Sequence, residues 1–483
     1  MKQHDEKTQR NDSSRLSNAA TEIAEPATGD RGFARPLVTP AWGRGDTISL
    51  FLILLVAGLL RLINLDYMEF KGDEANNLFL AADLVSGKAF PLVGITSSIG
   101  TYNPPFFIYL MGIPMFFSRN PVIAAGFVAL LNCAAAGLTY IFCRRYFGQI
   151  VAIIAAGFFA VNPWAVFYSR KIWQQDVLPL FVIGFFFALF AVVCEGRKRH
   201  LLTCFACLAA ATQLHLSSVY FLVVLVLTLA WFRPKIGWRI YLGGVAILFS
   251  SYVPYLAYDV FNRGYNTKIY LRAFSSHSHF HPEALLTPLA LGSTLGFMHF
   301  TDWPLLDVLQ TLLFIAGAVY SFFRRRDPGY AILLLWFCVP LAFLMVSKLV
   351  LYPHYFICFY PIQFIVVGVA VNAAMQNLRS RDKALKYVIP ALVTVLAAYQ
   401  TLSSVKFVAS IAAPGQLAWA WYGSDYGPPF RFRVQEIREL TRRGITDPEA
   451  VQREILQGKP PSAAVNYDSY STKYIVENLN AIP

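Results

Sequence analysis

The sequence predicts an all-α integral membrane protein with about eleven membrane-spanning helices. Of its 483 residues, 56% are hydrophobic and only 14% are charged, whereas soluble domains have about 25% charged residues. Apolar runs long enough to cross a bilayer recur along the chain, and short basic clusters separate them. The net charge of +13 is spread over these clusters. Such loops are typical of the cytoplasmic side of a membrane protein and argue against nucleic acid as a partner.

The expected spans place all five basic clusters on one side of the membrane. The clusters are Arg144-Arg145, Arg197-Lys198-Arg199, Arg233 with Lys235 and Arg239, Arg324-Arg325-Arg326, and Arg379 to Lys386. An even number of crossings must then separate any two of them. The runs that satisfy this rule cover residues 48–65, 121–143, 149–167, 177–194, 200–215, 217–232, 240–258, 304–323, 329–347, 355–374 and 387–405. This arrangement predicts an N-terminus inside and a C-terminus outside.

Two apolar stretches are not counted as spans. Phe106 to Phe117 has about a dozen residues, fewer than the roughly 17–25 that a crossing helix needs. It follows a Pro104-Pro105 break, and we expect a helix that lies in the membrane interface within the first outer loop. Leu285 to Phe300 is expected to dip into the membrane or lie on its surface.

The two ends of the chain differ from the middle. Residues 1–46 are polar and lack apolar periodicity, so we expect a disordered cytoplasmic tail. No cleavage pattern follows the first span, which predicts an uncleaved anchor that opens a polytopic domain over residues 47–405. Residues 406–483 predict a small extramembrane region on the outer side. A helix is expected there from Asp447-Pro448-Glu449 onward, because proline is favoured in the first turn.

The acids that follow the first span are the first candidates for chemistry. Asp73 and Glu74 lie in the run Phe70-Lys71-Gly72-Asp73-Glu74-Ala75, and the counting of spans puts them on the outer face. On a helix, adjacent side chains point about 100° apart, so the two acids would have different roles. Asp176, at the start of the fourth span, lies on the same face. Cations that would meet an anionic substrate there are Lys71, Arg170 and Lys171. The alternative is that these are ordinary interfacial charges.

A second outer element begins before the tenth span. Lys348 and His354 lie at the membrane surface among aromatic residues, in the run Ser347 to Phe356. A phosphate attached to a lipid would lie at this height. An aromatic belt with a snorkelling lysine explains the aromatic residues equally well. It does not explain why Lys348 departs from the distribution of the other basic residues.

The long outer loop contains His277, His279 and His281. In an extended strand the three would share one face, as ligands of a metal do. The alternative is a polar loop with chance histidines. The seven cysteines lie in or at the edges of spans, so neither a disulfide framework nor a cysteine zinc site is expected.

Several features together make the chain resemble the polytopic C-type (GT-C) glycosyltransferases. They are the first span, the Asp73-Glu74 pair, the Pro104-Pro105 segment, the outer Ser169-Arg170…Asp176 and the late Tyr360-Pro361. The resemblance covers about residues 48–375. Within the family, the chain is similar to the group of the protein O-mannosyltransferases and the lipid A aminoarabinose transferase.

The resemblance implies an inverting enzyme of the bacterial inner membrane whose active site faces the periplasm. It would move a sugar from a polyprenyl-phosphate donor to a glycan, lipid or protein acceptor. Asp73 matches the family's catalytic aspartate and would take the proton of the attacking group, next to Glu74. Asp176 matches the second acidic position. Lys71, Arg170, Lys171, Lys348 and His354 would bind the donor phosphate. No cofactor is required by this reaction, and it does not obviously require a metal.

Two positions depart from the aminoarabinose transferase group. Its members carry a basic residue three positions after the catalytic aspartate, where this chain has Asn76, and often a lysine before Pro-Pro, where it has Asn103. This argues against the aminoarabinose enzyme itself. A lipid-linked sugar flippase or transporter without catalysis is the alternative function, and a catalytically inactive scaffold is another. The spans are nearly free of charge at their centres, whereas transporters place ionisable groups there.

Overall fold

The structure is a computed structural model. It describes residues 41–275, 280–297, 303–347, 351–378, 385–413, 428–457 and 467–483. The expected tail is outside this part of the chain except for its last residues. The α-helices are α2 Arg44–Leu62, α3 Gly72–Val85, α4 Phe106–Phe117, α5 Pro121–Tyr146, α6 Gln149–Val161, α7 Pro163–Tyr168, α8 Leu178–Cys194, α9 His200–Leu214, α10 Tyr220–Phe232, α11 Trp238–Ser251, α12 Val253–Phe261, α13 Tyr265–Ser275, α14 Thr287–Gly292, α15 Pro304–Phe323, α16 Pro328–Met345, α17 Ile362–Leu378, α18 Leu385–Ser410, α19 Phe430–Arg442, α20 Pro448–Leu456 and α21 Ser469–Glu477. Short 3₁₀ helices are η1 Leu65–Tyr67, η2 Gln174–Val177, η3 Leu216–Val219, η4 Pro282–Leu285, η5 Pro353–Phe359 and η8 Leu479–Ala481.

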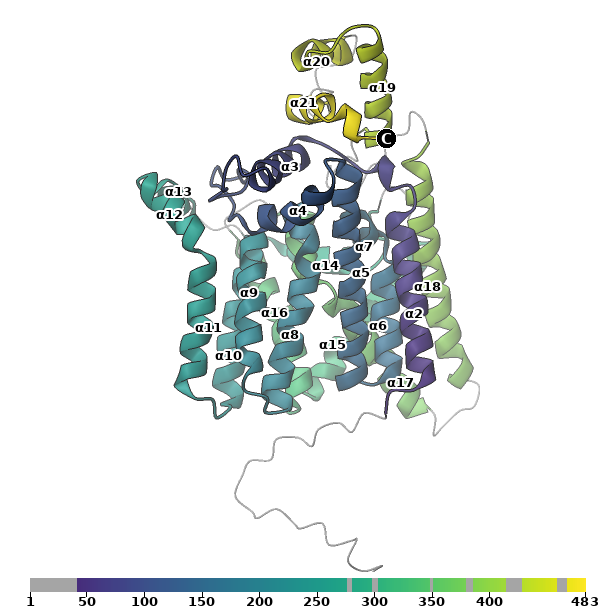
Figure 1. The fold of residues 1–483 in the computed structure, drawn as a ribbon. Coiled ribbons are helices and arrows are strands. Elements are labelled where there is room, and N and C mark those ends of the chain that lie inside the picture. The colour runs from purple at the N-terminus through teal and green to yellow at the C-terminus, as the bar shows by residue number, and fades with distance from the viewer. Residues whose placement is uncertain are drawn as a thin grey trace, which may run out of the picture. The chain divides into compact units, whose positions relative to one another are not determined.

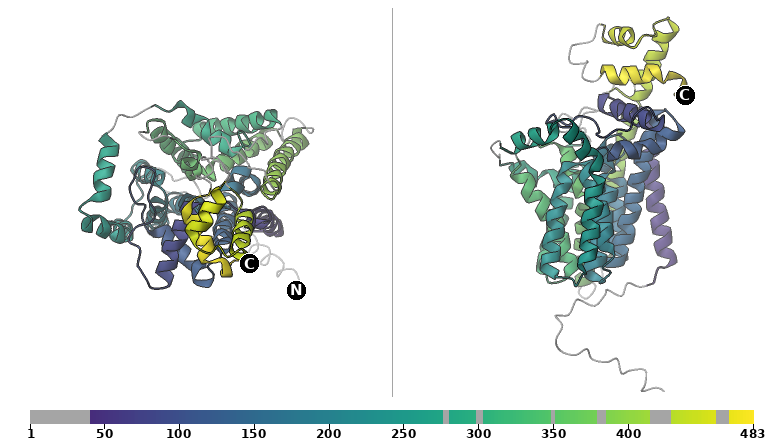
Figure 2. Two further views of the ribbon diagram at one scale, coloured as in Figure 1. Left: turned by 90° about the horizontal axis from the view of Figure 1, so that it is seen from above. Right: turned by 60° about the vertical axis from the view of Figure 1, so that its left-hand side comes forward.

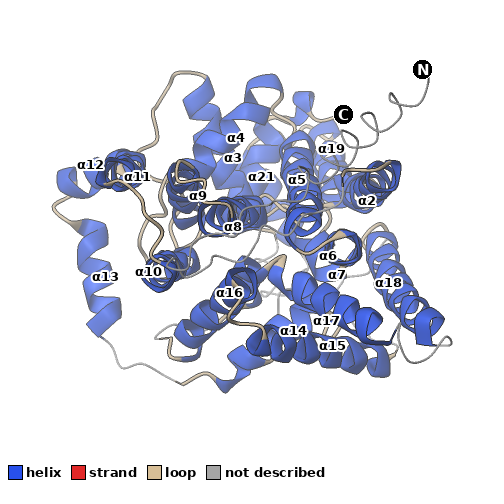
Figure 3. Cartoon of the chain, turned by 90° about the horizontal axis from the view of Figure 1, so that it is seen from below, coloured by secondary structure: helices blue, strands red, loops and turns tan. Residues whose placement is uncertain are grey.

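The expected all-α membrane fold is confirmed. The long helices run side by side, and no strand is drawn in the part of the chain that the structure describes (Figures 1 and 3). Six helices are long and apolar enough to cross a membrane, or up to eight if α11 with α12 and η5 with α17 each form one bent span. The other expected spans correspond to the shorter apolar helices α6, α9 and α10. Length and composition alone therefore do not reach the expected number of crossings.

Ion pairs join the basic connections at one end of the bundle. Arg145 in the last turn of α5 and Arg197 after α8 both pair with Glu195, at 2.6 and 2.9 Å. At the same end, Arg144 Nε donates to the Asp46 carboxylate at 2.5 Å, which ties the start of α2 to the end of α5. The first clusters of the predicted inner side thus lie together.

Two arginines fasten the opposite end of α2. Arg61 donates to the carbonyls of Phe159 and Ala160 at 3.0 and 2.7 Å, where α6 ends. Arg170 donates to the carbonyls of Ile63 and Asn64 at 2.8 and 2.7 Å, just beyond α2. The last carbonyls of a helix lack intrahelical partners and carry partial negative charge, so buried guanidinium groups stabilise them.

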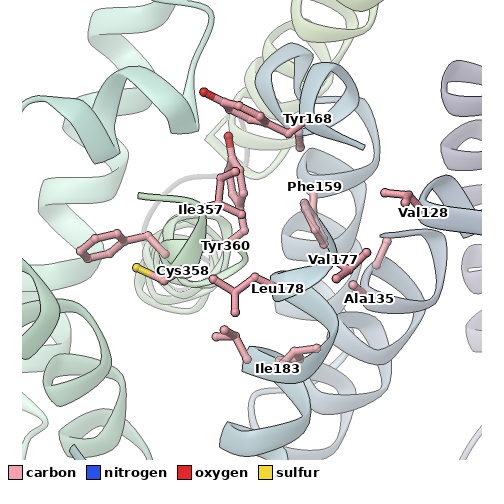
Figure 4. Close-up of a cluster of buried hydrophobic side chains, with 14 of the residues drawn as sticks. Val128, Ala135, Phe159, Tyr168, Val177, Leu178, Ile183, Ile357, Cys358 and Tyr360 are labelled. Carbon is pink, nitrogen blue, oxygen red and sulfur yellow. The ribbon is translucent and has the colours of Figure 1, made fainter. Parts of the chain in front are cut away.

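The core beside these contacts is aromatic. Phe159 of α6 stacks on Tyr360 at 5.7 Å between ring centroids, and both lie among Tyr168, Val177 and Ile357 in Figure 4. The expected span 149–167 is in fact broken between α6 and α7. Asn162 adopts an extended backbone there and accepts the Ala165 N–H to begin α7.

Within the segment expected to dip or lie on the surface, the short helix α14 is buried. Helix α14 packs against α17 and α7, and its residues Thr287, Pro288, Ala290, Leu291 and Gly292 are inaccessible. The Gly292 carbonyl accepts hydrogen bonds from Gln310 and Gln400 at 2.5 and 3.2 Å. These amides replace the water that a buried helix end would otherwise need.

A layer of shorter helices lies at the end of the bundle opposite the basic connections. Helix α4 is a 12-residue helix that packs on α3, as expected of an interfacial helix. Helices α19 to α21 lie over α3 (Figures 1 and 2). Helix α20 begins as the sequence predicts, because Asp447 accepts the Ala450 N–H at 2.9 Å and Pro448 follows it.

Candidate active site

A cavity of about 230 Å³ lies between the bundle and this layer. Its walls come from α3, the loop between α3 and α4, the turns that precede α8 and α10, and the start of η5. The polar and aromatic lining residues are Asp73, Asn77, Thr96, Ser97, Ser98, Thr101, Asn103, Trp173, Gln174, Gln175, His215, Ser217, Tyr220, Tyr270, Ser347, His354 and Tyr355. Among the described residues, the lining contains no lysine or arginine.

The N-terminus of α3 separates the two adjacent acids. The helix begins at Gly72, and the Lys71 N–H donates to Glu74 Oε2 at 3.0 Å, which caps the first turn. Glu74 is completely buried, whereas the side chain of Asp73 is exposed to solvent and lines the cavity. The first turn of α3 therefore presents only Asp73 to a substrate.

Asn77 lies one turn after Asp73 on the same face of α3 and also lines the cavity. Its side chain is 1% exposed, and neither amide atom hydrogen-bonds to a described residue. A buried amide without partners costs about 1–3 kcal/mol. Asn77 is thus suited to a ligand that supplies both a donor and an acceptor, as a sugar hydroxyl does.

Behind the cavity wall lies a buried cluster of charges centred on Glu69. The Glu69 carboxylate is 1% exposed and forms ion pairs with both Lys71 and Lys171. Lys171 is 2% exposed, and its Nζ lies 3.9 Å from the ring centroid of Trp173, which itself lines the cavity. The positive charge of Lys171 is therefore compensated by Glu69 and lies against an aromatic ring of the wall.

Burial and neighbouring charges set the protonation of this cluster. The side chain of Asp73 is exposed, but the protein around it still partly desolvates the carboxylate and raises its pKa above the ordinary value; the charge of Asp468 adds to the shift while Lys171 opposes it. Burial also raises the pKa of Glu74 to about 8. Burial works in the same direction on Glu69, but Lys171 and Lys71 hold the pKa of that carboxyl below its usual range. At neutral pH, Glu69 is the charged partner of the lysines, and Glu74 is largely neutral.

Two histidines lie at the other side of the cavity. The ring centroids of His215 and His354 are 6.0 Å apart, and His354 contacts the ring of Trp173 at 5.6 Å. The Ser217 N–H donates to His215 Nδ1 at 3.3 Å, so a neutral His215 carries its proton on Nε2. These imidazoles offer hydrogen-bond donors in a lining that has no lysine or arginine among the described residues.

The loop 94–104 forms a further wall and is held by the arm α12–α13. The Tyr102 N–H donates to Asn266 Oδ1 at 2.9 Å, and Tyr255 donates its hydroxyl to the Tyr102 carbonyl at 3.1 Å. Asp259 in turn accepts the Asn266 N–H at 2.7 Å, which fixes the start of α13. The arm thus sets the position of the loop that faces Asp73 across the cavity.

No protein-family model matches the sequence, and no curated protein matches it. Similarity appears in solved structures. ArnT from Cupriavidus metallidurans in the apo state gives a TM-score of 0.52 at 17% identity, over 90% of this chain and 77% of that one. The same protein bound to undecaprenyl phosphate gives 0.50 at 14% identity, over 90% and 78%. The apo oligosaccharyltransferase from Archaeoglobus fulgidus gives 0.50 at 13% identity, and this chain covers 63% of its length.

The chain has the GT-C glycosyltransferase fold.

Within this GT-C fold, the predicted site residues fall into three groups. Asp73 and His354, which are far apart in the sequence, line the same cavity. Glu74 and Asp176 are buried beside it, and Asp176 is 1% exposed. Lys71 and Lys171 are paired with Glu69, and Arg170 is fully buried with its guanidinium on the carbonyls beyond α2. Arg170 is therefore a structural residue of the GT-C fold and is not part of the candidate site.

The remaining expectations lie partly outside the described residues. Lys348, His277 and His279 are not among them. His281 is described, and its Nδ1 lies 2.7 Å from Glu283 Oε1. Within the described ranges, no group of three or more His, Cys, Asp or Glu side chains has the geometry of a metal site.

Sequence reasoning missed three residues of the site. His215 is the last residue of the expected span 200–215, which the counting of spans ends on the outer face, so a histidine there was a usable signal. Asn77 is one helical turn from Asp73 and follows from the same helical face. Glu69 carried no such signal, because its pairing with Lys171 joins segments about a hundred residues apart.

Proposed function

We propose that the protein is a membrane glycosyltransferase that moves a sugar from a polyprenyl-phosphate donor to an acceptor. The observation that carries the proposal is Asp73, the one acid of its pair that faces a cavity within a GT-C fold. ArnT of this fold has been seen with undecaprenyl phosphate bound, which supports a lipid-borne donor. The active site would face the periplasm of a bacterial inner membrane.

Asp73 acts as the general base in this proposal. It accepts the proton of the acceptor hydroxyl or amine as that group attacks the anomeric carbon, and the lipid phosphate leaves with the bonding electrons, which inverts the carbon. A raised pKa favours this role, because a base works best when its pKa approaches the working pH. Positioning of the two substrates supplies the remainder of the catalysis, since phosphate is already a good leaving group.

The phosphate of the donor binds at the histidine side of the cavity. His215 and His354 present imidazole N–H groups, and Ser217 and Tyr355 line the same region. The two histidines take the place of the basic side chains that the aminoarabinose transferase group carries at the positions of Asn76 and Asn103. Leu216, Leu344 and Tyr220 form an apolar side of the cavity where the lipid chain would leave.

The sugar lies between the histidines and α3, where Asn77 meets its hydroxyls. The unpartnered amide of Asn77 supplies one donor pair and one acceptor, and Gln175 extends the polar wall. A site built in this way rejects sugars that lack the matching hydroxyl, because the amide is then left buried without a partner.

Transfer from labelled donors tests the proposal. The full-length protein in nanodiscs is incubated with radiolabelled polyprenyl-phosphate sugars and a membrane extract as acceptor. We expect label to leave the lipid, and we expect Asp73→Asn to abolish this at unchanged expression and thermal stability. Asp83→Asn is the matched control, because Asp83 lies on the same helix and pairs only with the exposed Lys88.

The alternative functions predict other results. A flippase or transporter binds the donor equally well with Asp73→Asn and releases no label from lipid. A scaffold tolerates Asp73→Asn in every measurement. Either result overturns the enzymatic proposal.

A further inference from the structure

The C-terminal helices hold the loop that leads into α3, the helix that carries Asp73. The Phe430 N–H donates to the Met68 carbonyl at 2.9 Å, just before Glu69. Tyr474 of α21 contacts the rings of Phe70 and Phe79 at 5.5 and 4.9 Å between centroids. These contacts fix both the entry to the loop and the face of α3 that turns away from the cavity.

A buried arginine adds a polar connection to the same loop. Arg433 of α19 is 1% exposed and donates to the Phe70 carbonyl at 2.8 Å. The same guanidinium donates to Ser471 Oγ at 2.7 Å and to Thr472 Oγ1 at 3.0 Å, both in α21. Arg433 therefore joins α19, α21 and the loop at one point.

Asp468 lies against Gly72, the residue before Asp73. It caps α21 by accepting the Ser471 N–H at 2.8 Å. A methyl group on Gly72 would be 3.0 Å from Asp468 Oδ1. No space for a side chain remains between the cap of α21 and the first turn of α3.

We propose that Asp468 is a positioning residue for Asp73, which it influences by its charge and by its contact with Gly72. The proposal rests on the proposed role of Asp73. The other charged groups that act on Asp73 are Lys171, Glu69 and Lys71. Glu74 lies beside it, and the nearby cations of the C-terminal layer are Arg433 and Lys473. Asp468 adds a like charge, which favours the protonated form of Asp73 and makes its carboxylate a stronger base.

The protonation of Asp73 is measured directly on the full-length protein in nanodiscs. A hydrophobic carbodiimide adds to a protonated carboxyl group and leaves a stable acylurea, which mass spectrometry locates. The labelling of Asp73 is followed from acid to neutral pH for the wild type and for Asp468→Asn. Asparagine caps a helix about as well as aspartate, so this variant removes the charge and keeps α21.

We expect Asp468→Asn to shift the half-labelling pH of Asp73 to lower values, and the acid limb of sugar transfer to shift with it. Asp447→Asn is the matched control, because Asp447 caps α20 of the same layer in the same way. It should shift neither curve. Identical labelling curves for the wild type and Asp468→Asn would overturn the proposal.

The labelling measurement needs no turnover, so it separates this inference from the proposed function. A shifted labelling curve without transfer from any donor would leave the link between Asp468 and Asp73 intact and count against the enzyme. Loss of thermal stability in Asp468→Asn is checked by the same comparison with Asp447→Asn. An equal shift in both variants would also overturn the proposal, because it would reflect the charge of the whole layer.

Discussion

Asp73 and Glu74 are neighbours in the chain, yet their carboxylates lie in different environments. Asp73 lines the cavity, whereas Glu74 Oε2 accepts the Lys71 N–H at 3.0 Å and is completely buried. The first turn of α3 therefore separates the two carboxylates, with Glu74 in the cap of the helix and Asp73 in the cavity lining.

The first prediction separates the two acids. Asp73→Asn should lower the rate of transfer by about 10²–10⁴-fold, the usual contribution of a general base. Glu74→Gln should keep most of the activity, because Glu74 is largely neutral at pH 7 and glutamine still accepts the Lys71 N–H. Initial rates of both variants check this, and equal losses would place both carboxyl groups in the reaction.

The second prediction concerns pH. The pKa of Asp73 is raised, and a general base works only when deprotonated, so transfer should fall as the pH falls through that pKa. The acid limb should lie above pH ~4, the ordinary value for aspartate. A rate profile over pH with saturating donor checks this. An acid limb at or below the ordinary value would contradict the assignment of Asp73.

Glu74 also makes stability depend on pH. Its pKa is raised to about 8 in the folded protein, so folding favours the protonated form. This contribution to the free energy of unfolding is fully present below the ordinary glutamate pKa and is lost as the pH rises through about 8. The melting temperature of the wild type should therefore fall as the pH rises over this range. Glu74→Gln should remove that part of the dependence, and an unchanged slope would argue against a buried neutral Glu74.

The fourth prediction tests the buried ion pair. Lys171→Met removes one partner of Glu69 and should destabilise the protein by about 3–5 kcal/mol, because a buried charge then loses much of its compensation. The double variant Glu69→Gln with Lys171→Met removes both charges of the pair and should recover part of this loss. Thermal unfolding in one detergent gives the comparison. A double variant that is no more stable than Lys171→Met alone would contradict this prediction.

The fifth prediction concerns the donor phosphate. His215→Gln and His354→Gln should each weaken binding of a sugar-free polyprenyl phosphate by about 10-fold or more, as expected when a hydrogen bond to a charged group is lost. Asp73→Asn should leave this binding unchanged. Binding is measured in nanodiscs of neutral lipid, and unchanged affinity in both histidine variants would move the phosphate site elsewhere.

The membrane fold was predictable because a bilayer imposes length and hydrophobicity on every span. The counting of spans placed Asp73 and His354 on the same face of the membrane, and both line the cavity. Side-chain partners were not predictable in this way. The sequence shows that Arg170 and Lys171 are cations near an outer acid. It does not show that Arg170 turns to the carbonyls beyond α2 or that Lys171 pairs with Glu69.

The break in the expected span 149–167 has a similar reason. Its hydropathy is continuous, so the pattern alone favours one helix. Asn162 and Pro163 end α6 and begin α7, because the asparagine side chain caps the second helix and proline cannot supply an N–H to the first. Such a local signal is easily overridden by hydropathy when spans are counted.

The hydrogen bond from Arg433 to the Phe70 carbonyl joins residues 363 positions apart. During synthesis, the segment that leads into α3 is made long before α19 and α21. The loop before α3 and the first turn that carries Asp73 therefore lack their final contacts until the last helices have been made. An incompletely made chain would have the spans and the acid but not the arrangement around it, so assembly of this site is among the last events in the folding of the molecule.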